Sequence, residues 1–347
     1  MDRFLPFNDE LAELINAKSE LLFRYLHPLK AEELGLSPHG VHYFNTSHLN
    51  RLFFSVQTSA HLLYGAINLL KKKPSEITLM DYGAGIGSLY LLAKMIGCKK
   101  VVYNDLLEEW KNNAQCIASA INIEVDNYLV GDIDTTLMQL ADANIELDLI
   151  TSRNVIEHIY ELTDFYTAVK EKQPKAFIYS STTANFHNPA MNLQHVLWHK
   201  KWQPKYREQR LDFLLRSYPQ LSKSALKQLA KQTNGYRYSD LIAWINNNDI
   251  LSKKKPSKKY VYTNTCEPEF GVWAENLLPF QLHKIKGKTA GYDIQIKSGF
   301  WDTHYTKQWK TKLGKFCNAL ALKWPFLRFS LAPFIYVIAI PETEKVD

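Results

Sequence analysis

Asp81-Tyr82-Gly83-Ala84-Gly85-Ile86-Gly87-Ser88 is the stretch of the 347-residue sequence that decides the fold. It directly follows a short apolar run at 77–80 and precedes an apolar pattern with helical spacing. Glycines at alternate positions in such a turn let the backbone approach a ligand closely, and the next helix offers free amide groups at its first turn. The stretch therefore predicts a small-molecule site between a strand and a helix.

Short apolar runs alternate with helical patterns around this turn, which indicates an α/β core. The spacing of the runs is that of a parallel sheet with crossover helices. The expected strands are 77–80, 100–103, 128–130, 147–151 and 176–179, with two more at 292–297 and 334–340.

Helical periodicity dominates on either side of the core. The clearest expected helices are 9–27, 47–70, 206–215, 223–231 and 239–246. We expect an N-terminal helical lid (1–73), an α/β core (74–184), a helical cap insertion (185–265) and a segment (266–347) that completes the sheet and contains a basic helix.

Composition narrows the class of protein. Hydrophobic residues make up 46% and charged residues 22%, which is typical of a globular chain. The four cysteines stand far apart, so neither a disulfide framework nor a cysteine zinc site is indicated. The apolar run at 329–340 is shorter than the roughly 20 residues needed to span a bilayer. We expect a cytoplasmic protein with no transmembrane segment.

Asp105 stands twenty-two residues after Gly83, at the end of the second expected strand. A carboxylate there can accept two hydrogen bonds from a ribose diol. A dinucleotide fingerprint needs a third glycine at position 88, where this chain has Ser88, so the pattern disfavours NAD. S-adenosylmethionine carries the same diol, and Asp105 could also be a helix cap.

Two more positions extend the pattern: Asp132 after the third expected strand, and Asn154-Val155 after the fourth. With them, the sequence resembles the class I S-adenosylmethionine-dependent methyltransferases over about 77–181. The resemblance implies a Rossmann-like sheet, mostly parallel with its last strand antiparallel, and S-adenosyl-L-methionine as cofactor. It implies that the glycine turn faces the methionine portion, that Asp105 holds the ribose and that Asp132 meets the adenine amine. The expected cofactor-binding residues are Asp81, Tyr82, Gly83, Ala84, Gly85, Gly87, Asp105, Leu106, Asp132, Ile133, Asn154 and Val155. Asp132 could equally cap the following helix.

Methyl transfer from a sulfonium is an in-line displacement that mainly needs alignment and exclusion of water. The motifs therefore leave the acceptor atom open between oxygen and nitrogen. We expect a hydroxyl or amine on a saccharide, lipid-linked glycan, peptide or secondary metabolite. An RNA methyltransferase is the first alternative, and a non-catalytic nucleotide-binding module is the alternative from another class.

The segment from Asn154 to His158 also resembles the Glu-x-x-Glu-His segment that carries metal ligands in small-RNA 2′-hydroxyl methyltransferases, with Asn154 in place of the first acid. Because that change removes a charged ligand, we expect no metal. Glu157 and His158 remain candidate catalytic residues. Should a metal bind there, His187, His195 and His199 are the candidates to complete its shell.

The expected cap contains histidines among aromatic residues, which suits the wall of an acceptor pocket. His187 most closely follows the fifth expected strand and is the candidate general base for a hydroxyl acceptor. His195, Trp198 and His199 are candidate substrate-binding residues. All of these could instead form the core of the cap.

Three further segments could contact partners. The turn-rich stretch 264–275 could close over the active site. The stretch 307–328 mixes lysines with large apolar residues, as a membrane-surface helix does, although such a helix more often packs on a sheet. The formal charge of +7 includes lysines at 253–259, yet arginines are few and no nucleic-acid motif is present, so nucleic acid is not the favoured partner. The oligomeric state is left open.

Overall fold

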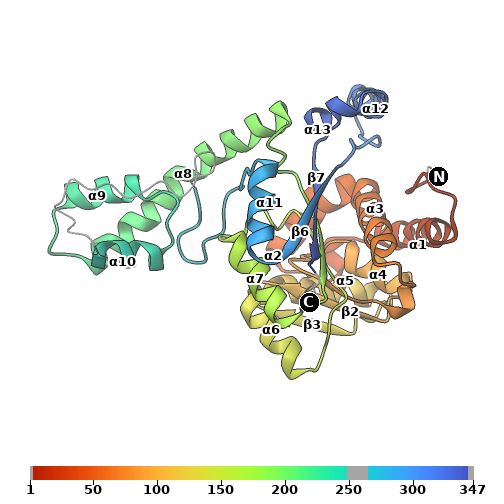
Figure 1. Ribbon diagram of the computed structural model, residues 1–347, viewed down its shortest axis with the longest axis horizontal. Helices are drawn as coiled ribbons and strands as arrows, with labels where there is room; N and C mark the ends of the chain where they lie inside the picture. Colours follow the sequence, from red (N-terminus) through yellow and green to blue (C-terminus); the bar gives the residue numbers. More distant parts are fainter. Residues whose placement is uncertain (1–2, 248–264, 343–347) are drawn as a thin grey trace, which may run out of the picture.

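The strands expected from the sequence lie side by side in one sheet of the computed structural model, which describes residues 3–247 and 265–342 (Figure 1). Within these residues the strand order is β3-β2-β1-β4-β5-β7-β6. β1 to β5 are parallel, and β7 is antiparallel to β5 and β6, as expected. The strands are β1 (Thr78–Asp81), β2 (Lys100–Asp105), β3 (Asn127–Val130), β4 (Leu149–Arg153), β5 (Phe177–Thr182), β6 (Tyr292–Ser298) and β7 (Ile335–Pro341).

The central strands are apolar in sequence because their side chains are buried. Every residue of β1 is buried, because helices cover both faces of the parallel part of the sheet. β6 alternates buried and exposed residues in its first half, as an edge strand does. The carboxyl ends of β1 to β5 meet at one edge, and this edge carries the glycine turn.

Helices lie on both faces of the sheet and extend beyond it (Figure 1). The N-terminal and core helices are α1 (Glu10–Leu26), α2 (Pro38–Tyr43), α3 (Leu52–Leu70), α4 (Leu89–Met95), α5 (Glu108–Ala120), α6 (Ile133–Asp142) and α7 (Leu162–Lys172). Those after β5 are α8 (Pro189–Ser217), α9 (Lys223–Gln232), α10 (Tyr238–Asn247), α11 (Phe280–Thr289), α12 (Gln308–Lys323) and α13 (Arg328–Leu331). None of the described helices is long and apolar enough to cross a membrane.

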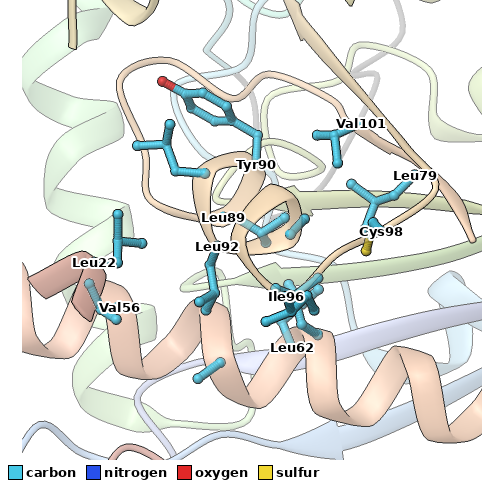
Figure 2. Close-up of a cluster of buried hydrophobic side chains, with 14 of the residues drawn as sticks. Leu22, Val56, Leu62, Leu79, Leu89, Tyr90, Leu92, Ile96, Cys98 and Val101 are labelled. Atoms are coloured by element: carbon cyan, nitrogen blue, oxygen red, sulfur yellow. The ribbon is translucent and has the colours of Figure 1, made fainter. Parts of the chain in front are cut away.

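The N-terminal helices share one core with the sheet. Figure 2 shows Leu22 of α1 and Leu62 of α3 beside Leu92 of α4, with Val101 of β2 in the same cluster. All four side chains are buried. Residues 10–70 are thus part of the structural core; the division of the chain into domains stays a prediction.

The segment after β5 forms an arm with a small core of its own. α8 spans 29 residues and continues through Pro204, so it begins well before the helix expected at 206–215. Its distal half packs with α9 and α10 through buried residues such as Leu214, Leu226 and Leu241. In Figure 1 this arm projects away from the sheet. The lysine-rich segment 253–259 lies outside the described residues.

The shared core predicts the effect of trimming α3. Leu62 is fully buried, so Leu62→Ala should lower the free energy of unfolding by about 2–5 kcal/mol through lost burial and an unfilled cavity. Leu322→Ala is the matched control, because Leu322 is 80% exposed and its loss should change stability by less than about 0.5 kcal/mol. Denaturant unfolding checks both. Equal, small effects would mean that α3 is a loosely attached lid.

Candidate functional site

The turn after β1 adopts a conformation that depends on glycine. Gly83 and Gly85 have φ of +66° and +52°, in the left-handed region. A Cβ at Gly83 would lie 2.6 Å from Cγ2 of Val155, so a larger residue there would collide with the loop after β4. Tyr82 N donates to Thr151 O at 2.8 Å and Ala84 N donates to Asn104 O at 2.9 Å. The turn is therefore fixed against β2 and β4 on either side.

Asp105 ends β2 directly beside this turn. Its Oδ2 accepts from Gly85 N at 2.9 Å and its Oδ1 accepts from Leu107 N at 3.2 Å. Burial raises the pKa of this carboxyl, and these backbone donors oppose the rise. α5 begins only at Glu108, after an N-cap at Leu107, so Asp105 is not the N-cap of that helix. A carboxylate has about four acceptor positions, so two remain available to a ligand.

A cavity of about 740 Å³ opens at this edge of the sheet. That volume is within the usual range for small-molecule sites. Seven of the predicted cofactor-binding residues line it: Tyr82, Gly83, Asp105, Leu106, Asp132, Ile133 and Val155. The other five, Asp81, Ala84, Gly85, Gly87 and Asn154, are not among its lining residues: Asp81 ends β1, and the other four lie in the loops after β1 and β4. Asp132 both lines the cavity and caps α6, where its Oδ1 accepts from Thr135 N at 2.9 Å.

The opposite wall of the cavity comes from the arm and from the loop before α11. Trp202 and Tyr206 of α8 line it together with Arg237, Phe270 and Trp273. The last two belong to the turn-rich stretch 264–275, for which the sequence left open a plain loop or a segment that closes over the active site. The Trp273 ring stacks on Tyr160 at 5.2 Å, which holds this loop against the core. The cavity therefore lies between the sheet and the arm.

One face of α8 points toward this region. His195, His199, Trp202 and Tyr206 follow a spacing of four, three and four residues, which places them on one side of the helix. His195 and His199 are buried, and their Nε2 atoms donate to Thr183 O at 2.9 Å and to Glu275 O at 2.6 Å. Trp198 is partly exposed and packs its ring on His195. None of these three predicted substrate-binding residues is among those that line the cavity, and their role stays a prediction.

The three candidate catalytic residues lie in different surroundings. His158 lines the cavity, and its Nδ1 donates to Trp273 O at 2.8 Å. Glu157 is buried behind it. His187 is half-buried with its ring 4.0 Å from that of Phe280, and it is not among the residues that line the cavity. Their catalytic roles are not tested by this geometry.

A glycine turn after β1 and acids after β2 and β3 meet at the carboxyl edge of a sheet ordered 3-2-1-4-5-7-6 with β7 antiparallel. The fold is that of the class I methyltransferases. The resemblance noted in the sequence is confirmed at the level of the fold.

The chain is similar to solved structures that share 13–24% of its sequence. No family model and no curated relative matches the chain. Solved structures that it is similar to include an S-adenosylmethionine-dependent methyltransferase from Mesorhizobium loti, 13% identical, covering 80% of this chain and 97% of that one, with a TM-score of 0.39. Another is ribosomal protein L11 methylase from Lactobacillus delbrueckii subsp. bulgaricus, 24% identical, covering 36% of this chain and 60% of that one, with a TM-score of 0.28. A third is TrmN from Thermus thermophilus, 19% identical, covering 36% of this chain and 38% of that one, with a TM-score of 0.29.

The sequence singled out only part of the cavity lining. It marks Trp202 and Tyr206 as aromatic residues of the expected cap, and no motif marks Tyr160 or Arg237, yet all four line the cavity. The Arg237 guanidinium lies 4.1 Å from the centre of the Tyr160 ring. The spacing of Trp202 and Tyr206 after His195 and His199 was the available signal, and Pro204 between them concealed that one helix carries all four.

Asp81 is a buried acid at the end of β1. Burial raises its pKa to about 7, although Arg153, the Tyr90 amide and the Thr151 hydroxyl oppose the rise. In the unfolded chain the pKa of an aspartate is about 3.9. Between about pH 4 and 7, Asp81 therefore keeps a proton in the folded protein that it has lost in the unfolded chain. The charged form is therefore the less stable one in the fold.

This titration predicts how stability depends on pH. Asp81 should lower the free energy of unfolding as pH rises from about 4 to 7, by up to about 1.4 kcal/mol per pH unit. Asp81→Asn cannot ionise and should lack that part of the decline. The check is denaturant unfolding of both proteins across this range. Parallel curves would show that Asp81 ionises as freely in the folded protein as in the unfolded chain.

Proposed function

We propose that the protein is an S-adenosylmethionine-dependent methyltransferase. The observation that carries the proposal is the Asp105 carboxylate, held by the Gly85 amide at the wall of a 740 Å³ cavity. A ribose diol placed against Asp105 would donate to the two acceptor positions that the backbone leaves open. Bonds of this charged kind are worth about 1.5–3 kcal/mol each.

The remaining lining residues suit the other parts of the cofactor. Leu106 and Ile133 offer apolar surface for the faces of an adenine ring, and Asp132 offers an acceptor for its amine. The methionine portion would lie along Gly83, where the missing side chain leaves the backbone accessible. Val155 packs on that glycine and would face the sulfonium side.

Bound S-adenosylmethionine would supply its methyl group to an acceptor oxygen or nitrogen. The acceptor would lose a proton, and S-adenosylhomocysteine would leave with the electron pair of the broken carbon–sulfur bond. The wall formed by Tyr160, Trp202 and Trp273 excludes water and aligns the acceptor, which is the main catalytic requirement of this displacement. His158 is the candidate catalytic residue that lines the cavity.

The proposed ribose contact predicts a loss of cofactor affinity on substitution. Asp105→Ala should weaken binding of S-adenosylhomocysteine about 10-fold to 100-fold, and Asp105→Asn should also weaken it while keeping the shape of the side chain. Titration calorimetry on the folded variants measures this. Asp142→Ala, on the exposed end of α6, should bind like the native protein. Unchanged affinity in both Asp105 variants would remove this residue from the site.

The surface of α12 favours an acceptor located at a membrane. Only Gly314 of this helix is buried, and the segment around it leaves large apolar side chains exposed, with Leu322 at 80% and Phe326 at 78%. From 303 to 341 the chain has six lysines and arginines and no acidic residue. Exposed aromatic and aliphatic side chains interspersed with cations are typical of helices that bind anionic membrane surfaces.

The position of α12 supports this reading. The helix lies between β6 and β7, and Ile335, the first residue of β7, pairs with Thr182 at the carboxyl end of β5. α12 and α13 therefore project from the edge of the sheet that carries the cavity (Figure 1). Among the acceptors that the sequence left open, a lipid-linked one fits this arrangement best.

Vesicle binding tests the membrane proposal. The native protein should sediment with phosphatidylcholine vesicles that contain phosphatidylglycerol and much less with pure phosphatidylcholine. Replacing Trp309 and Phe316 by alanine should weaken binding about 10-fold or more, since each side chain loses about 1.5–3 kcal/mol of burial. Met138→Ala, an exposed apolar position on α6, should have no effect. Equal binding by the double variant, or binding of RNA without binding of vesicles, would contradict the proposal.

A further inference from the structure

Five ionisable side chains from three distant segments meet behind the cavity wall. Glu157 and His158 follow β4, His195 and His199 lie on α8, and Glu275 belongs to the loop before α11. Backbone bonds join this loop to the segment after β4: Trp273 N donates to His158 O at 3.1 Å, and Asn276 N donates to Glu157 O at 2.8 Å. The cluster is thus part of the fold.

Ligand atoms of three of these side chains lie close enough to share a single ion. One atom each from Glu157, His158 and Glu275 all lie within 4.8 Å of one another. Nδ1 of His195 lies 3.6 Å from Oε2 of Glu275. Glu157 is 2% exposed, Glu275 6% and His195 1%, so water reaches these groups poorly.

The hydrogen bonds of the three histidines leave lone pairs turned into the cluster. Each histidine donates from one ring nitrogen to a backbone carbonyl: His158 to Trp273, His195 to Thr183 and His199 to Glu275. In a neutral histidine held in this way, the other ring nitrogen can only accept. This is how proteins orient metal-binding histidines.

Several acceptor atoms of the cluster have no hydrogen-bond donor. Neither carboxylate oxygen of Glu157, nor Oε2 of Glu275, has a hydrogen-bond partner of normal geometry among the described residues, and the same holds for Nδ1 of His195 and of His199. Two buried carboxylates this close repel each other unless a cation lies between them or one of them is protonated. The unpartnered acceptor atoms could therefore bind a cation.

We propose that Glu157, His158, His195 and Glu275 bind a divalent transition-metal ion. Two carboxylates and two imidazoles suit Zn²⁺ or Mn²⁺, whereas Mg²⁺ and Ca²⁺ prefer oxygen ligands alone. His199 is a positioning residue, because its Nε2 donates to the Glu275 carbonyl. This proposal replaces the expectation of no metal, which rested on Asn154 in place of an acid; Glu275 supplies that acid from elsewhere in the chain.

The ion would lie next to the site of methyl transfer. His158 lines the cavity on one side and belongs to the cluster on the other. On the proposed function, an acceptor oxygen in the cavity could take an open position on the ion, which would orient it toward the methyl group. Asn154 has φ of +55°, a left-handed conformation that asparagine tolerates better than glutamate, so the local backbone is consistent with the missing acid.

Metal binding is tested with Zn²⁺ and Mn²⁺ on the chelator-treated full chain. Calorimetry should show stoichiometric binding, and Co²⁺ should give visible absorption bands of a protein-bound ion. His199→Ala should weaken Zn²⁺ binding about 10-fold to 100-fold, as expected for a residue that supports a ligand, and Glu157→Gln and Glu275→Gln should weaken it further. Glu146→Gln, an exposed acid, is the matched control and should leave binding unchanged.

Two results would overturn the metal site. One is a folded protein that binds neither ion, in which case the two glutamates share a proton. The other is unchanged affinity in both glutamine variants with normal circular dichroism. S-adenosylhomocysteine binding is measured on the same samples: its presence without metal binding overturns only the ion site, and its absence with metal binding overturns only the proposed function.

Discussion

The close approach of the turn after β1 to the loop after β4 sets the geometry of the whole site. Gly83 has no room for a Cβ because Val155 occupies that space, and the left-handed Gly85 offers its amide to Asp105. These contacts bring the ends of β1, β2 and β4 together at one edge of the sheet. A cofactor bound there would meet backbone on one side and a fixed carboxylate on the other, at little cost in reorganisation. The N-terminal helices stabilise this edge because they share a core with α4, the helix that follows the glycine turn.

The second half of the site comes from segments far away in sequence. α8 brings two buried histidines and two pocket aromatics on one face, and the loop before α11 brings Trp273 and Glu275. A hydrogen bond to a backbone carbonyl fixes the ring of each histidine, so the rings are already oriented in the absence of a ligand. One wall of the cavity is therefore built from the sheet, and the other from the arm and its neighbouring loop.

The sheet and the cavity wall at its carboxyl edge could be predicted because their signals are local. A strand of four to seven residues, a glycine turn and an acid at the next strand end are each visible within one short stretch, and the fold only has to place them in order. Glu275 could not be predicted, because nothing near it in sequence relates it to Glu157. Pro204 hid the length of α8, since proline usually ends a helix pattern while this helix runs through it. The exposure of α12 also required the structure, as its sequence fits a packed helix equally well.

The proposed function requires the cavity beside Gly83 and Asp105 to bind S-adenosylmethionine. The decisive measurement is a crystal structure of the protein grown with S-adenosylhomocysteine. We expect density for the ligand in this cavity, with both ribose hydroxyls within hydrogen-bonding distance of the Asp105 carboxylate and the sulfur on the side of Val155. An empty cavity at saturating ligand, or a ligand bound elsewhere on the chain, would contradict it.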